Sequence, residues 1–167
     1  MSELLRVENL SVSFDTPRGE IQAVRGVSLA LSRGEVLAVV GESGCGKSVL
    51  CKAVMKLLPP TARIRAGRIF LNGIDITDYR EREMRKLRGR AFSMVFQDPM
   101  TALNPTIPVG RQIAEAVRAH NRRLPEAAVR QKVLALMELV GIERGAERYD
   151  LCPHSFSGGM RQRAVMA

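Results

Sequence analysis

The chain has few features that would place it in a membrane or direct it out of the cell. No apolar run approaches the roughly 18 consecutive residues that a membrane-spanning helix needs. The first ten residues contain Glu3, Arg6 and Glu8 and lack the apolar core of a signal peptide. These absences predict a chain with neither a membrane span nor a secretion signal.

Cysteine is also scarce, and its spacing excludes the usual metal sites. The three cysteines, Cys45, Cys51 and Cys152, include no closely spaced metal-binding pair. Their number is odd, which argues against a complete disulfide framework. We therefore expect reduced thiols, as in an intracellular protein.

Acidic residues are outnumbered by basic ones. The 17 Asp and Glu residues against 26 Lys and Arg residues give a net charge of +9. This sign favours an acidic partner, which would be a nucleotide, a nucleic acid or an anionic membrane surface. The densest basic stretch, 80–90, has no aromatic residues interleaved to stack on bases. We interpret it as a solvated helix face in preference to a nucleic-acid or lipid patch.

The stretch around which the chain is organised is 41–48, with the sequence GESGCGKS. It fits the phosphate-binding P-loop pattern G-x-x-x-x-G-K-[ST], which should lie between a buried strand and a helix. The apolar run Glu35–Val40 precedes it and predicts the buried strand. Apolar residues then recur at helical spacing until Pro59 and Pro60 end the helix.

The residue types of this loop match the chemistry of phosphate binding. Glycines let consecutive N–H groups point inward at phosphate oxygens, and the helix adds its positive N-terminal end. The Lys47 ammonium is expected to contact the β- and γ-phosphates, and the Ser48 hydroxyl to ligate Mg²⁺. A structural turn without a ligand would not explain this Lys-Ser pair. The predicted cofactor-binding loop comprises Gly41, Glu42, Ser43, Gly44, Cys45, Gly46, Lys47 and Ser48.

Several short strands are expected around this loop, as in an antiparallel sheet beside a parallel one. Alternating residues predict strands over Leu4–Phe14 and Val27–Leu31. Asn72-Gly73, between Arg68–Leu71 and Ile74–Ile76, is a strong signal for a two-residue hairpin. Thr77 or Asp78 is expected to cap a short helix that reaches Leu87.

A second buried strand is predicted over Ala91–Phe96, and it ends at Gln97-Asp98-Pro99. Polar residues at the carboxyl end of such a strand lie where ligands bind. Asp98 would be a Mg²⁺-binding acid, or Gln97 would be an amide that contacts metal or water. A plain turn set by Asp98-Pro99 is the third interpretation.

Helices are expected to dominate from about Asp98 to the end. Apolar residues between Val129 and Val140 form one amphipathic stripe, with Pro125 suited to the first turn and Gly141 to the end. Ser157-Gly158-Gly159 then precedes another helix. It is either a second anion site or a capped turn.

Together these motifs resemble the nucleotide-binding subunit of ATP-binding cassette (ABC) transporters. The resemblance implies an α/β P-loop NTPase fold: an antiparallel β subdomain and a RecA-like core over 1–97, and a helical signature subdomain over 98–167. It places Gln97 as the Q-loop glutamine, a catalytic residue and a Mg²⁺ contact, which makes Asp98 the less favoured metal acid. It places Phe14 at the A-loop aromatic that stacks on adenine, although core packing is an alternative for Phe14. The implied signature residues, which would contact ATP in the partner subunit, are Ser157, Gly158, Gly159 and Met160.

Other residues resemble one group of these transporters more specifically. The stretch Gln97–Pro105 is similar to one typical of bacterial importers of oligopeptides, dipeptides and nickel. Pro153-His154 and Phe156–Arg163 resemble the same group, but Cys152 and Ser155 depart from it.

The resemblance also implies cofactors, partners and a location. ATP and Mg²⁺ would be the cofactors. A second ABC ATPase subunit, identical or paralogous, would close over two ATP molecules. Membrane-spanning permease subunits would sense this closure at the cytoplasmic face of the bacterial inner membrane. An extracellular solute-binding protein would deliver a peptide or a related small solute.

The sequence ends at Ala167, before any apolar strand that closes in Asp-Glu, and neither His120 nor His154 is placed as a switch histidine. The resemblance therefore predicts an N-terminal portion of an ABC ATPase, ending before Walker B. We expect this portion to bind ATP poorly and to hydrolyse it only at background level. A P-loop small-molecule kinase and a basic nucleic-acid-binding protein are the alternative functions.

Overall fold

The computed structural model describes residues 3–96 and 102–167. The chain divides into two compact units, Met1–Phe92 and Ser93–Ala167. The boundary expected between Gln97 and Asp98 lies outside the described residues.

The first unit is built on an antiparallel sheet. Its strands are β1 (Glu3–Thr16), β2 (Gly19–Ser32), β3 (Ala62–Leu71) and β4 (Ile74–Asp75), in the spatial order β2-β1-β3-β4. The predicted strands over Leu4–Phe14 and Val27–Leu31 are confirmed. The Asn72-Gly73 hairpin between β3 and β4 is also confirmed, and both residues have positive φ, 49° and 78°.

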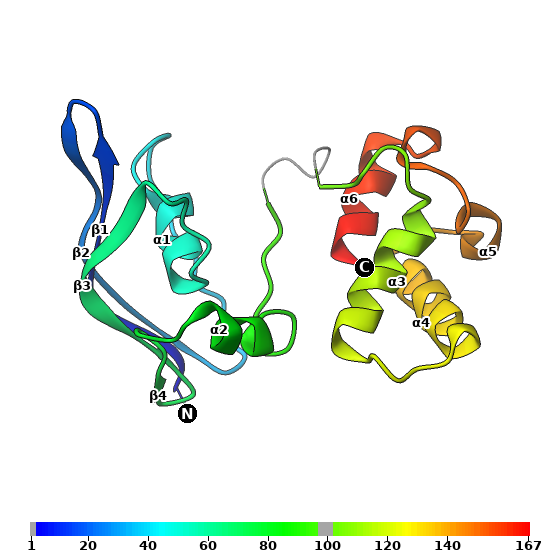
Figure 1. Ribbon diagram of the computed structural model, residues 1–167, viewed down its shortest axis with the longest axis horizontal. Helices are drawn as coiled ribbons and strands as arrows, with labels where there is room; N and C mark the ends of the chain where they lie inside the picture. Colours follow the sequence, from blue (N-terminus) through cyan, green and yellow to red (C-terminus); the bar gives the residue numbers. More distant parts are fainter. Residues whose placement is uncertain (1–2, 97–101) are drawn as a thin grey trace. The chain divides into compact units, whose positions relative to one another are not determined.

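Helix α1 (Lys47–Val54) lies against one face of this sheet (Figure 1). Its buried Leu50 and Ala53 share one apolar core with strand residues such as Val7, Leu10 and Val12. The predicted helix includes apolar residues as far as Leu58, but α1 ends at Val54 because Lys56 has φ 51°. The Leu57 N–H then donates to the Lys52 carbonyl over 2.8 Å, which satisfies the end of the helix.

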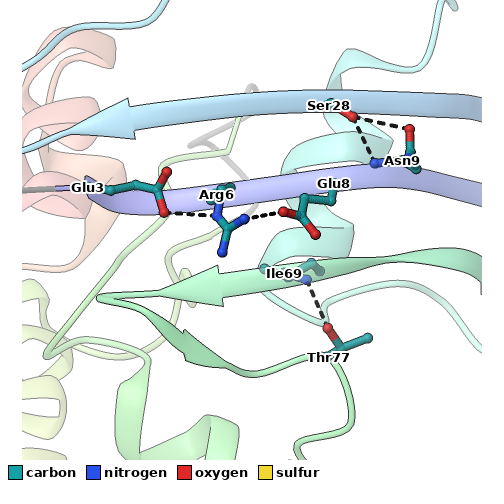
Figure 2. A network of polar contacts seen from close by, with 7 residues as sticks. All are labelled: Glu3, Arg6, Glu8, Asn9, Ser28, Ile69 and Thr77. Atoms are coloured by element: carbon teal, nitrogen blue, oxygen red, sulfur yellow. Dashed lines mark hydrogen bonds and ion pairs between the residues drawn. The ribbon is translucent and has the colours of Figure 1, made fainter.

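A β-bulge bends β1 at Asn9. Val7 pairs with Leu29, but Leu10 pairs with Val27, so β1 has one extra residue. The Asn9 N–H donates to Ser28 Oγ over 2.8 Å, which satisfies a donor that the bulge removes from the ladder (Figure 2). The bulge is therefore accommodated by a side chain of the neighbouring strand.

Helix α2 (Glu81–Leu87) begins later than predicted. Its N-cap is Arg80, whose N–H donates to Glu83 Oε2 over 2.8 Å, so the predicted cap at Thr77 or Asp78 is wrong. Thr77 is engaged elsewhere: its Oγ1 accepts the Ile69 N–H over 2.8 Å (Figure 2). The Thr77 hydroxyl therefore accepts a hydrogen bond from β3 and does not cap the helix.

The two predicted buried strands, over Glu35–Val40 and Ala91–Phe96, are not observed, so both predictions are wrong. Residues 35–40 form no strand, and Val36 and Val40 are 93% and 90% exposed. In 91–96 only Phe92 makes an isolated bridge, to Arg88, and Val95 is 57% exposed. A buried parallel strand needs neighbouring strands to cover it, and none of the residues in 3–96 or 102–167 forms a ladder with either segment.

The second unit is helical, as predicted. It contains α3 (Val109–His120), α4 (Glu126–Leu139), α5 (Gly145–Arg148), the 3-10 helix η2 (Pro153–Ser155) and α6 (Gly158–Met166). Within this unit α3 packs against α4 and α6 (Figure 1). Pro125 is the N-cap of α4, one residue before the predicted first turn, and Gly141 follows the helix with φ 75°. In the part of the chain that the structure describes, no helix combines the length and the apolar character of a membrane span.

Candidate functional site

The loop 41–48 has a backbone that depends on two of its glycines. Gly44 and Gly46 have φ values of 83° and 96°, which side chains rarely allow. Gly46 is also the N-cap of α1, and a Cβ there would collide with the carbonyl oxygen of Ala23 in β2. The bend that joins the loop to the helix therefore requires glycine for its conformation and for its close approach to the sheet.

A bulge in β2 provides that approach. Val12 pairs with Val24 while Ser13 pairs with Gln22, so Ala23 is the extra residue of the pair. A bulge turns the local backbone out of the ladder. Here it places the Ala23 carbonyl against the start of α1.

The Lys47 side chain folds across the loop that precedes it. Its Nζ donates to the carbonyl oxygens of Gly41 and Glu42 over 2.7 and 2.6 Å. It also lies 3.5 Å from Cys45 Sγ. The positive charge is therefore held inside the curve of the loop.

The start of α1 adds further donors. The first helical bond runs from the Leu50 N–H to the Gly46 carbonyl over 2.9 Å. The N–H groups of residues 47–49 consequently precede the i→i−4 ladder, and such groups bind anions at helix N-termini. Together with Lys47 they form a site suited to phosphate oxygens.

The same loop fits a magnesium-bound nucleotide. Ser48 is exposed in the first turn of α1, where its hydroxyl is free to serve as an oxygen ligand. No group of three His, Cys, Asp or Glu side chains within 3–96 and 102–167 is arranged to hold a metal. Magnesium bound here would take phosphate oxygens among its ligands, as is usual for this ion.

Phe14 lies on β1, and in the β1–β2 pairing it is near Ala23, the residue whose carbonyl contacts Gly46 of the loop. It pairs with Ile21 of β2, and Ile21 is two residues from Ala23. Its ring is partly buried and packs against the core that α1 shares with the sheet. Core packing is therefore observed, and the exposed remainder of the ring is available to a base.

The residues predicted to form the signature, Ser157–Met160, lie in the second unit, at the start of α6. The Ser157 hydroxyl accepts the Met160 N–H over 3.3 Å and caps the helix. Gly158 and Gly159 are exposed, and a Cβ at either position would meet nothing within 4 Å. Met160 is partly buried, and its sulfur accepts a weak hydrogen bond from Arg148 over 3.5 Å. The fold itself therefore explains Ser157 but not the two glycines.

Gln97 and the competing Asp98 lie outside the described residues. The structure brings Phe14, the P-loop and the start of α1 into one unit and places Ser157–Met160 in the other.

Sequence reasoning missed Arg88, which it grouped with the solvated basic stretch. Arg88 is only 19% exposed in its side chain, and it donates to the carbonyls of Met55 and Lys56 just beyond α1, over 3.0 Å each. It also pairs with Glu81 over 2.7 Å, and this hydrogen bond holds the pKa of Glu81 below its ordinary value of 4.5. Nothing in the local sequence distinguishes Arg88 from its exposed neighbours, because its partners are about 30 residues away.

Comparisons with known proteins agree with this geometry. The dipeptide transport ATP-binding protein DppD of Bacillus subtilis (strain 168) is 52% identical over the whole chain, which spans 50% of that protein. The oligopeptide transport ATP-binding protein OppD of the same organism is 49% identical, and the chain spans 47% of it. This chain therefore spans about half the length of these curated relatives.

Solved structures show the same fold. The ATP-binding cassette MJ0796, in a dimeric post-hydrolysis state bound to ADP and phosphate, superposes with a TM-score of 0.82 at 21% identity. The match covers 98% of this chain and 67% of that one. The α/β cassette fold that the motifs predicted is thus confirmed. The family model described as "ABC transporter" matches residues 24–167, so the chain belongs to the ABC transporter family.

Proposed function

We propose that this chain is the part of an ABC importer's ATPase subunit that binds ATP. The observation that carries the proposal is the conformation of Gly46 and Lys47. The glycine brings the helix start against β2, and the lysine ammonium is held within the loop by two carbonyls. A bound triphosphate would offer Lys47 stronger, charged acceptors than these carbonyls.

Each predicted site residue then has a role toward Mg·ATP. The N–H groups at the start of α1 and the Lys47 ammonium would bind the β- and γ-phosphates, while Ser48 and Gln97 would hold the magnesium ion. Bound magnesium neutralises charge on the phosphates, which favours phosphoryl transfer to water in the whole subunit. Phe14 would stack on the adenine, and the loop residues Gly41–Gly46 would enclose the phosphate chain.

The exposed glycines of α6 support an approach by a second subunit. Among the residues that the structure describes, no atom lies within 4 Å of a Cβ at Gly158 or Gly159, so packing within the described chain does not require glycine at either position. In our proposal Ser157, Gly158, Gly159 and Met160 cover the γ-phosphate of an ATP bound to a partner subunit, which is identical or paralogous. ATP would hold the two subunits together until its hydrolysis released them.

The names of the relatives support a proposal for the substrate class. They are ATP-binding proteins of dipeptide and oligopeptide transport. We accordingly propose a subunit at the cytoplasmic face of the bacterial inner membrane that binds permease subunits through the Gln97 segment and the helical region 98–167. A solute-binding protein would supply the peptide or related solute. Family membership makes the kinase and nucleic-acid-binding alternatives less favoured.

Calorimetric titration of the chain with Mg·ATP tests the proposal. We expect Lys47→Ala to weaken binding about ten- to a hundredfold, because a charged hydrogen-bond donor to phosphate is lost. Lys52→Ala, in the last turn of α1, is the matched control and is expected to bind as the parent does. Absence of ATP binding by the parent chain, or equal losses in the two variants, would contradict the proposal.

A further inference from the structure

One arginine links three strands of the sheet. Arg65 extends from β3, donates from Nη2 to Asp15 Oδ1 of β1 over 2.6 Å and from Nε to Glu20 Oε1 of β2 over 3.0 Å. Because β1 lies between β2 and β3, the side chain reaches across the central strand. A single guanidinium thus connects the end of the β1–β2 hairpin to the third strand.

The hairpin has an electrostatic reason to need this contact. Asp15 and Glu20 are direct cross-strand partners, and like charges in that arrangement destabilise a strand pair. The Arg65 guanidinium lies between the two carboxylates and offsets both charges. Arg63 also contacts this cluster, but only at Asp15, over 3.2 Å and with 68% of its side chain exposed.

The backbone of β3 is shaped to deliver Arg65. Ser11 pairs with Ala66 and Val12 pairs with Ile64, so Arg65 is an extra residue without a partner of its own in β1. A bulged residue leaves the regular alternation of faces and re-aims its side chain. The bulge therefore directs the guanidinium along the sheet toward the hairpin end.

The residues that Arg65 holds flank the proposed adenine contact. Asp15 follows Phe14, and Glu20 precedes Ile21, the cross-strand partner of Phe14. Successive side chains of a strand point to opposite faces, so the ion pairs lie on one face and Phe14 on the other. Phe14 packs against the core that includes Leu50 of α1, on the side where Ala23 contacts Gly46.

We propose that Arg65 is a positioning residue for the nucleotide base. It fixes the end of the β1–β2 hairpin, so that the Phe14 ring is positioned to stack on the base of a nucleotide bound at the P-loop. This inference rests on the proposed function, because it requires a nucleotide bound at that loop. It predicts that Arg65 contributes to binding of the base and not to binding of the phosphates.

The test compares ATP with inorganic triphosphate, which lacks the base, by calorimetry on the chain and its Arg65→Met variant. We expect ATP binding to weaken about three- to tenfold, as for a partial loss of base stacking, while triphosphate binding stays unchanged. Arg63→Met is the control, because Arg63 is a neighbouring arginine that pairs with Asp15 alone in this cluster. We expect it to change ATP binding less than twofold, as for an exposed ion pair.

A double-mutant cycle with Phe14→Ala completes the experiment. If Arg65 acts through the ring, Arg65→Met should weaken ATP binding little further once Phe14 has been truncated. Equal losses for ATP and triphosphate would indicate a general structural role and overturn the proposal, and so would full additivity with Phe14→Ala. If triphosphate binds in a Lys47-dependent way but Arg65→Met leaves ATP binding unchanged, the P-loop proposal stands and this one fails. If neither ligand binds the parent chain, both fail.

Discussion

Gly46 lies so close to the carbonyl oxygen of Ala23 that a Cβ at this position would collide with it. The first residue belongs to the loop proposed to bind phosphate, and the second belongs to a bulge in β2. The loop is therefore supported by the antiparallel sheet as well as by its own helix. A change at Gly46 acts on both the loop and the sheet.

Gly46→Ala is expected to destabilise the first unit by at least about 2 kcal/mol, through strain at positive φ and through the collision with β2. Gly44→Ala is the matched control. Gly44 has a similar φ of 83°, but a Cβ there would meet nothing within 4 Å. It should cost only the conformational strain, about 1 kcal/mol. Urea denaturation measures both, and equal losses would show that the contact with Ala23 contributes nothing.

Much of this site could be predicted because its signals are local. A P-loop depends on the residue types within eight positions, and Gly41–Ser48 indicated the loop and the start of α1 near Lys47. The Asn72-Gly73 turn and the Ser157 cap are local in the same way, and both were found where expected. The contacts that support the loop are not local. Neither the Ala23 bulge nor the Arg88 hydrogen bonds leave a pattern in the sequence near the loop.

The errors have a related cause. The apolar run over 35–40 is typical of a buried strand, but hydrophobicity alone does not make a strand. A strand exists only where another segment offers its N–H and C=O groups, and no described segment does so for Val36–Val40. The cap of α2 was misplaced because Thr77, a good N-cap by type, already accepts a hydrogen bond from Ile69.

Arg88→Met should destabilise the first unit by about 1–3 kcal/mol, because the carbonyls of Met55 and Lys56 lose a charged donor. Methionine retains most of the apolar stem, so the change tests the guanidinium and not the packing. Arg82→Met, an exposed neighbour in α2, is the control and should stay within about 0.5 kcal/mol of the parent. Chemical denaturation measures both. Similar losses of stability for the two variants would show that the Arg88 guanidinium contributes no more to stability than an exposed arginine does.

The Glu81–Arg88 pair predicts a specific dependence of stability on pH. Because Arg88 lowers the pKa of Glu81 below 4.5 in the folded chain, the folded state binds this proton less readily than the unfolded state does. The stabilisation is thus complete above 4.5 and is lost as pH falls through the lower folded pKa. Glu81→Gln should lower stability at neutral pH. As the pH falls, the stability of this variant should then decrease less than that of the parent. Denaturation curves recorded from neutral pH to below 4.5 measure this, and parallel profiles for parent and variant would contradict the coupling.

The glycines of α6 should behave in the opposite way from Gly46. Gly159 lies within the helix, and a Cβ there would meet nothing within 4 Å, so Gly159→Ala should leave the second unit unchanged or stabilise it by up to about 1 kcal/mol. Ser157→Ala removes the cap on the Met160 N–H and should destabilise the same unit by about 1 kcal/mol. Thermal denaturation of the two variants therefore separates a residue that the fold needs from one that it does not. A loss of stability on Gly159→Ala as large as that on Ser157→Ala would mean that the glycine serves the chain itself. The argument for a partner's phosphate at this helix start would then lose its main support.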